Sequence, residues 1–202
     1  MGKKAHILAV LVLVALARPS GIVRSADPPY DHWAYLPMVL RAPEPHCGVV
    51  RVFDYDGVER DWGWLVEEFG AVWIEAGSGS ACVVELRAIR DDNTLIIRVV
   101  DSLGQPVGGV PVVFHYTTAP LLPPELVGCY DRGDYADTKY PPDGGAGSAG
   151  FGMYDGAWYC PPGGGPHTVW VGIGGSDCVH GLGMLCGRNH WHVNPTFMLT
   201  GK

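Results

Sequence analysis

Residues 94–116, TLIIRVVDSLGQPVGGVPVVFHY, decide the fold of this chain. They begin with Leu95–Val100, a run dense in β-branched residues that favours a strand. Residues 101–109 are rich in Asp, Gly and Pro, which set turn geometry. A second strand is expected over 110–116, and the two-residue period places Val113 and His115 on one face and Val110, Val112, Phe114 and Tyr116 on the other. A lone two-stranded ribbon is barely stable in water, so both strands are expected to belong to a larger sheet.

Short segments of the same kind recur along the chain, separated by turn residues. Strands are expected at 49–53, 71–75, 82–89, 149–153, 158–160, 168–173 and 193–199. A short helix is expected over 62–69, where apolar residues have helical spacing. Residues 117–147 form an excursion too long for an ordinary connection. About eight short strands predict an all-β fold, a sandwich or a barrel with long Gly/Pro-rich loops.

The N-terminal region has the features of a secretory signal. Lys3 and Lys4 precede an apolar run at 7–17 that is too short to span a bilayer. We therefore expect a signal peptide at 1–26, a Pro-rich leader at 27–45 and one β-domain at 46–199. Such a protein is expected outside the cell or at the cell surface, with no stable membrane insertion after cleavage.

The charge balance excludes one class of partner. The formal net charge is −7 at pH 7, from 14 basic and 21 acidic residues. A negative chain is repelled by polyphosphate, so nucleic acid is not expected as a partner.

Six cysteines in an exported chain predict three disulfides. Proximity in sequence favours Cys178–Cys186 across one loop and Cys129–Cys160 across the excursion, which leaves Cys47 with Cys82. The sequence contains no C-x-x-C pair, so a cysteine-bound metal is not expected.

The pattern over Val99–Phe114, a strand followed by D-x-x-G-x-P-x-x-G-V-x-V-x-F, resembles the bacterial Ig-like and carboxypeptidase-regulatory-like β-sandwiches. Residues 143–151 are similar to a second part of that pattern, D-x-x-G-x-[AG]-x-F. The ending, 176–192, resembles C-terminal β-modules of secreted bacterial proteins, which often accompany wall- or sugar-acting enzymes. The resemblance implies an Ig-like or transthyretin-like sandwich associated with the cell envelope or with sugars.

Large aromatic residues cluster late in the chain and form the best candidate binding site. A sugar requires a flat ring for stacking and polar groups beside it. Trp170 lies opposite the apolar Val169 and Val171 on its strand and is expected to be the most exposed. The alternative role for these rings is packing in the core. The expected ligand-binding residues are Trp158, Tyr159, Trp170, His190, Trp191 and His192.

Other chemistries are less well supported by the sequence. His180, His190 and His192 with Asp177 would offer metal ligands, but no strong ligand spacing is present, and they serve equally well as loop hydrogen-bonding groups. We expect no metal and no cofactor. No G-x-S-x-G elbow or persuasive carboxylate pair occurs, so no catalytic residue is assigned.

The sequence thus predicts a non-catalytic module that binds an extracellular polysaccharide or cell-envelope glycan. An alternative from another class is a structural subunit of a surface fibre or layer. In that case the apolar segment 33–41 would add a strand to the next copy, and the protein would self-associate.

Overall fold

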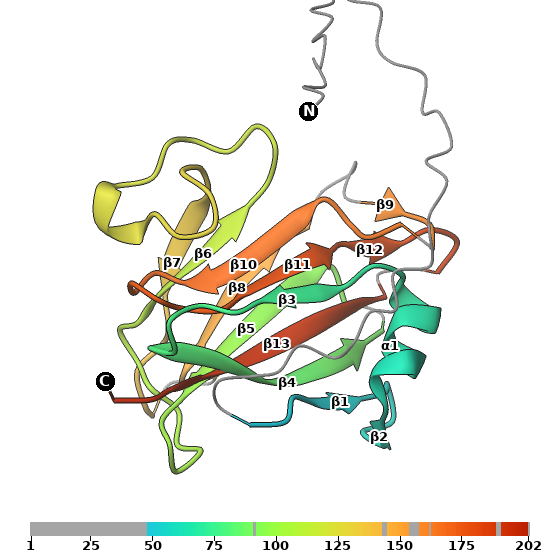
Figure 1. The fold of residues 1–202 in the computed structure, drawn as a ribbon, viewed down its shortest axis with the longest axis horizontal. Coiled ribbons are helices and arrows are strands. Elements are labelled where there is room, and N and C mark those ends of the chain that lie inside the picture. The colour runs from blue at the N-terminus through green and yellow to red at the C-terminus, as the bar shows by residue number, and fades with distance from the viewer. Residues whose placement is uncertain are drawn as a thin grey trace, which may run out of the picture. The chain divides into compact units, whose positions relative to one another are not determined.

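The structure is a computed structural model that describes residues 48–90, 92–142, 145–153, 158–161, 163–188 and 191–201. The expected signal peptide, the leader with its segment 33–41, Cys47 and His190 lie outside these residues. The described part of the chain is mostly β-strand, with sheets that pack against each other (Figure 1).

Within the described residues, two large sheets and one small sheet are formed. Sheet A has the strand order β2-β1-β4-β13-β5-β8. Its strands are β1 (Arg51–Phe53), β2 (Glu59–Arg60), β4 (Ala81–Ile89), β5 (Thr94–Val100), β8 (Ser148–Gly152) and β13 (His192–Leu199). Sheet B has the order β3-β11-β10-β6-β7. Its strands are β3 (Trp73–Glu75), β6 (Pro111–His115), β7 (Asp134–Asp137), β10 (His167–Val171) and β11 (Cys178–Leu182). The small sheet pairs β9 (Trp158–Tyr159) with β12 (Met184–Leu185) in parallel.

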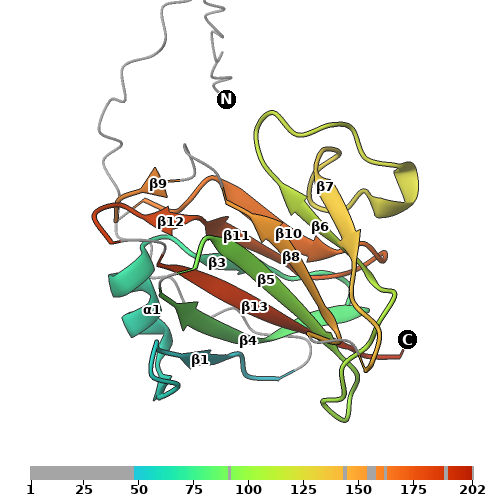
Figure 2. The ribbon, with the colours of Figure 1, turned by 180° about the vertical axis from the view of Figure 1, so that it is seen from behind.

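The core lies between sheets A and B and is filled by alternate residues of their strands. Sheet A contributes Leu95, Ile97 and Val99 from β5, and sheet B contributes Val169 and Val171 from β10. The closing strand β13 is central to sheet A, where it pairs antiparallel with β4 and parallel with β5 (Figure 2). The expected all-β fold of packed sheets is confirmed.

The two strands of the deciding stretch lie in different sheets. Both strands and their faces are confirmed, since Val112 and Phe114 join the main core while Val113 packs on the other side of β6. They do not form a ribbon, however, because β5 belongs to sheet A and β6 to sheet B. Residues 101–109 carry the chain from one sheet to the other.

The D-x-x-G turn at the start of this crossover occurs a second time in the fold. Asp101 Oδ1 accepts the backbone N–H of Leu103 and that of Gln105, each at 2.8 Å. Asp54 Oδ1 likewise accepts the N–H of the residues two and four positions later, at 3.0 and 2.9 Å. The fourth residue of the turn is Gly104 in the Asp101 turn and Gly57 in the Asp54 turn. Their φ angles are 77° and 78°, a conformation that glycine adopts without strain. The other oxygen of the Asp54 carboxylate accepts a hydrogen bond from Arg60 Nε of β2 at 2.7 Å, so both oxygens have partners.

The helix and several strands appear where the periodicity predicts them. Helix α1 (Trp62–Phe69) has the expected bounds and is capped by Asp61, whose side chain accepts the N–H of Trp64. Leu65 and Phe69 are its buried residues. Strands β2, β7, β11 and β12 were not expected. No helix in the described ranges is long and apolar enough to cross a membrane.

The disulfides differ from the pairing that proximity favours. Cys129 is bonded to Cys178 and Cys160 to Cys186, with Cα atoms 6.5 and 5.2 Å apart. The expected pairs Cys178–Cys186 and Cys129–Cys160 are therefore wrong. The reason is that β11 and β12 run between residues 178 and 186 and carry Cys186 to β9. No described cysteine is free, and the remaining expected pair includes Cys47, which lies outside the described residues.

Candidate functional site

The outer face of sheet B, the face directed away from the core, carries two rows of side chains. In the first row, cross-strand pairing joins Trp73 to His180, His180 to Thr168, and Thr168 to His115. The second row consists of Glu75, Cys178, Trp170, Val113 and Tyr135. The intervening residues Ile74, Val179 and Val169 point into the core. The sheet therefore separates an apolar inner face from an outer face rich in rings and polar groups.

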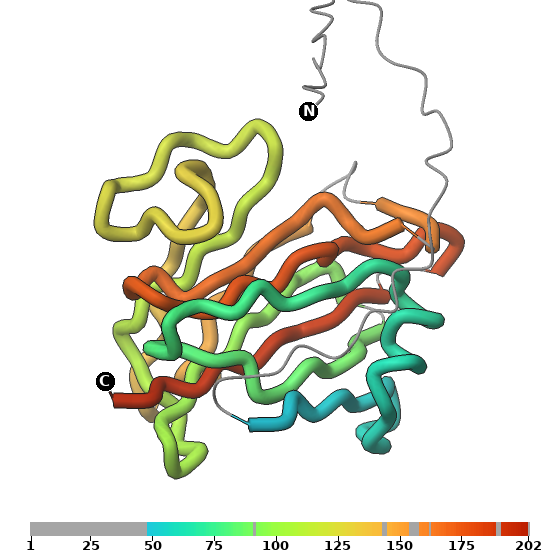
Figure 3. The backbone as a smooth tube through the Cα atoms, viewed as in Figure 1, coloured from blue at the N-terminus to red at the C-terminus, as the bar shows by residue number. Residues whose placement is uncertain are grey.

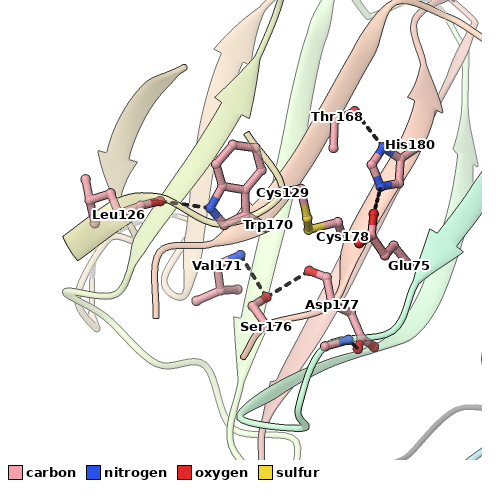
Figure 4. Close-up of a disulfide and its surroundings, with 11 residues drawn as sticks. Glu75, Leu126, Cys129, Thr168, Trp170, Val171, Ser176, Asp177, Cys178 and His180 are labelled. Atoms are coloured by element: carbon pink, nitrogen blue, oxygen red, sulfur yellow. Dashed lines mark hydrogen bonds and ion pairs between the residues drawn. A yellow bond between two sulfur atoms is a disulfide. The ribbon is translucent and has the colours of Figure 1, made fainter. Parts of the chain in front are cut away.

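Residues 116–133, the covering loop, leave the sheet after β6 and return to it at β7 (Figure 3). The loop includes the short 3₁₀ helix η1 (Pro124–Leu126). Its Leu122 and Leu126 form a second apolar cluster with Val113, Trp170 and Cys178. The Cys129–Cys178 disulfide joins the loop to β11 (Figure 4). The loop is thus held to the sheet both by packing and by a covalent bond.

Trp170 lies beneath this loop and is 1% exposed. Its Nε1–H donates to the Leu126 carbonyl at 3.0 Å (Figure 4). Gly128 lies against the indole, where an added Cβ would come within 2.5 Å of Nε1. The expectation that Trp170 points away from Val169 and Val171 is confirmed. The expectation that it is exposed is wrong, because the covering loop buries it.

A pocket of about 310 Å³ opens between the covering loop and the end of sheet B. Glu75 is the one acidic or basic side chain among the described residues that line it. The disulfide and Trp170 form part of its wall, and glycine-rich backbone forms much of the rest. The lining residues are Glu75, Ala76, Gly77, Val127, Gly128, Cys129, Trp170, Ile173, Gly174, Gly175, Ser176 and Cys178.

His180 is buried beside this pocket and is held at both ring nitrogens. Nε2 lies 3.2 Å from Glu75 Oε2, and Nδ1 lies 3.0 Å from Thr168 Oγ1 (Figure 4). An ionised carboxylate only accepts hydrogen bonds, so Nε2–H donates to Glu75 and Nδ1 accepts from the Thr168 hydroxyl. Burial lowers the pKa of His180, and the charge of Glu75 offsets part of that effect. His180 is therefore neutral at pH 7, and its contact with Glu75 is a hydrogen bond rather than an ion pair.

The order hydroxyl, imidazole, carboxylate is also that of a nucleophilic triad. In this chain the hydroxyl belongs to Thr168, which is 4% exposed. A substrate carbonyl would have to reach that oxygen through the rings and the loop above it. The arrangement is better suited to fixing the orientation of His180 and Glu75 than to attacking a substrate.

Further aromatic rings lie around His180 on the outer face of sheet B. The Trp73 indole stacks on the His180 imidazole, with centroids 3.9 Å apart and planes at 8°. Tyr130 of the covering loop meets His180 edge to face at 6.0 Å and stacks on His115 at 4.0 Å. His115 Nδ1 lies 2.8 Å from the carbonyl oxygen of Arg132, to which it donates. Trp73 and Tyr130 remain 42% and 40% exposed, so both rings are fixed in place yet accessible.

Three of the residues expected to bind ligand lie together at another place, around β12. Trp158 and Tyr159 pair with β12 on one side, and the carbonyl of Trp191 accepts the N–H of Leu185. Trp158 is exposed, whereas Tyr159 and Trp191 are partly buried against the core. Tyr159 donates its hydroxyl to the Phe69 carbonyl at 2.8 Å, and burial raises its pKa. Trp191 packs on Tyr55 at 4.3 Å and under the Arg188 guanidinium. These contacts hold the fold together, and Trp170 does not belong to this group of residues.

Of the histidines considered as metal ligands, His180 and His192 lie in different sheets, and His190 lies outside the described residues. His192 is fully buried in β13 of sheet A, and His180 faces outward from sheet B. The Asp177 carboxylate accepts the N–H of Gly77 at 2.8 Å and that of Val83 at 3.0 Å. Within the described ranges, the ligand-type cluster that includes a histidine joins His180 to the two cysteines of the Cys129–Cys178 disulfide.

Sequence reasoning missed Trp73, Glu75, Tyr130 and His115 as site residues. A signal for the first two was present, because Val72 and Ile74 alternate with Trp73 and Glu75 over a strand that was expected at 71–75. Tyr130 carries no such signal, since a loop without periodicity places it.

No protein-family model, curated protein or solved structure matches the chain.

Proposed function

We propose that the chain is a secreted, non-catalytic module that binds an extracellular polysaccharide or a cell-envelope glycan on the outer face of sheet B. The observation that carries the proposal is that the Trp73 indole is held in place and yet accessible to solvent. One face of its indole rests on His180, and 42% of the residue is still exposed. An indole that is both held in place and accessible offers the flat apolar face on which a sugar ring stacks.

The surroundings of Trp73 supply the polar groups that a sugar needs. Glu75 follows two positions later on the same face of β3, and its side chain is 57% exposed. Tyr130 and Tyr135 add further exposed rings on the covering loop and on β7. Aromatic faces together with acceptors for hydroxyl groups are the complement of a carbohydrate. The site thus replaces Trp170 of the sequence-based expectation with Trp73.

Secretion and the type of sandwich belong to the same proposal. Disulfides such as Cys129–Cys178 and Cys160–Cys186 persist in oxidising compartments, which supports an extracellular location. The D-x-x-G turn at Asp101 begins a connection between two packed sheets. This turn carries the resemblance to Ig-like and carboxypeptidase-regulatory-like domains, and we propose that the sandwich is of that Ig-like or transthyretin-like type.

The test is binding of the purified mature protein to a panel of insoluble polysaccharides and arrayed glycans, with the mass in solution measured in parallel. A protein of defined small mass that binds at least one glycan supports the proposal. A protein that binds none of them contradicts it. If it also forms ladders of polymers, the alternative of a fibre subunit assembled through residues 33–41 is favoured.

A further inference from the structure

The pocket beside Trp73 has the chemistry of a cation site. Glu75 is the one ionisable lining residue among the described residues apart from the bonded cysteines. Its hydrogen-bond partner His180 is neutral at pH 7, so the carboxylate is oriented without being neutralised. A carboxylate held in this orientation favours a positively charged group over a neutral or an anionic one.

The position of the pocket relative to Trp73 restricts what carries that charge. Trp73 and Glu75 are two positions apart on β3 and point to the same face, so their Cα atoms are separated by about 7 Å. A ligand that stacks on the indole and spans two sugar units can therefore reach the Glu75 carboxylate at the pocket wall. The volume of about 310 Å³ is at the lower end of the range for small-molecule sites, which begins at ~300 Å³. It suits one compact substituted ring rather than a long chain.

We infer that the glycan bound at this face contains amino sugars, and that Glu75 receives the protonated amine of one sugar unit in the pocket while Trp73 stacks on its neighbour. This inference rests on the proposed function, which it narrows from glycans in general to glycans with free amines. The contact is an ammonium–carboxylate hydrogen bond, which is stronger than a neutral one. It predicts binding that weakens as salt concentration rises.

The test compares soluble oligosaccharides of equal length and the same backbone linkage that differ at the second carbon of each unit: β-1,4-linked oligomers of glucosamine, of N-acetylglucosamine and of glucose. Titration calorimetry at pH 7, where His180 is neutral, measures each affinity. We expect the glucosamine oligomer to bind at least tenfold more tightly than the other two. Glu75→Gln should remove that preference, so that this variant binds the glucosamine oligomer no more tightly than the two neutral oligomers. Glu67→Gln, which removes an equal charge from the exposed face of α1, is the matched control and should keep the preference.

Three outcomes separate the inference from the proposed function. Oligomers that bind with equal affinity, before and after Glu75→Gln, overturn the amino-sugar inference and leave glycan binding standing. Putrescine that competes as strongly as a glucosamine oligomer also overturns it, because charge alone would then account for binding. If none of the three oligomers binds, the wider glycan panel described above decides whether the proposed function stands. In that case glucosamine hydrochloride is titrated into the protein, and its binding is followed by the NMR signal of the indole N–H of Trp170, which forms part of the pocket wall. A Glu75-dependent shift of that signal supports the pocket's part of the inference, and an unmoved signal overturns it.

Discussion

The indole of Trp73 lies parallel to the imidazole of His180, with their centroids 3.9 Å apart. His180 cannot turn away without breaking its hydrogen bonds to Thr168 and Glu75. The ring that supports Trp73 is therefore itself held from two neighbouring strands. A ring ordered before binding loses little conformational entropy when a ligand stacks on it, and this makes Trp73 a better platform than a freely rotating surface tryptophan.

Replacing Trp170 should affect folding first. Trp170→Ala removes a fully buried ring and the donor to the Leu126 carbonyl, and we expect a loss of about 3–5 kcal/mol in the free energy of unfolding. Trp170→Phe keeps most of the volume and should cost clearly less. Urea denaturation measures both values. A midpoint unchanged by Trp170→Ala would mean that the covering loop does not bury this ring.

The disulfide pairing can be checked by peptide mapping of the unreduced protein. We expect fragments that join Cys129 to Cys178 and Cys160 to Cys186. The Cys129–Cys178 bond spans 49 residues, and the chain-entropy relation gives about 4 kcal/mol for a loop of that size. The paired variant Cys129→Ala/Cys178→Ala should lose stability of that order. Fragments that join Cys178 to Cys186 would contradict the fold around β11 and β12.

The stability of the domain should fall as the pH is lowered through the range of histidine titration. His167 is buried against Phe114, and neither ring nitrogen has a hydrogen-bond partner among the described residues. Burial lowers its pKa from 6.5 to about 4. The unfolded chain thus takes up a proton near pH 6.5 while the folded chain remains neutral, so stability is complete above pH 6.5 and declines down to about pH 4. The difference in pKa corresponds to about 3 kcal/mol.

His167→Leu replaces the imidazole with an apolar side chain of similar size and removes this titration. Denaturant midpoints for both proteins, measured from pH 8 to pH 4, provide the comparison. The variant should lose less stability than the wild type between pH 6.5 and pH 4, and the two curves should run parallel above pH 7. Curves that remain parallel at all pH values would show that His167 is not the acid-sensitive group.

The alternation of residues along single strands could be read from the sequence, and it correctly predicted β5, β6, β10 and their inner faces. Pairing between strands was less accessible, because the turn at 101–109 gives no indication that the chain changes sheets. The site depended on a feature without periodicity, the covering loop at 116–133. That loop buries Trp170 and places Tyr130 against His180. Trp73, by contrast, remains 42% exposed. The predicted disulfide pairing was wrong for a similar reason, since distance along the chain does not measure distance across strands.

The most direct test of the account is the effect of Trp73→Ala on the affinity for a glycan that the wild-type protein binds. Tyr140→Ala is the matched control, because Tyr140 is also an exposed aromatic residue. It packs on Gly108 and Gly109, just before β6 begins, whereas the site residue His115 lies at the other end of β6. Calorimetric titration should show affinity at least about tenfold weaker for Trp73→Ala, or ~1.4 kcal/mol, with a thermal midpoint close to that of the wild type. The affinity of Tyr140→Ala should be unchanged. Glycan binding of wild-type strength by Trp73→Ala would contradict the placement of the binding site on the outer face of sheet B.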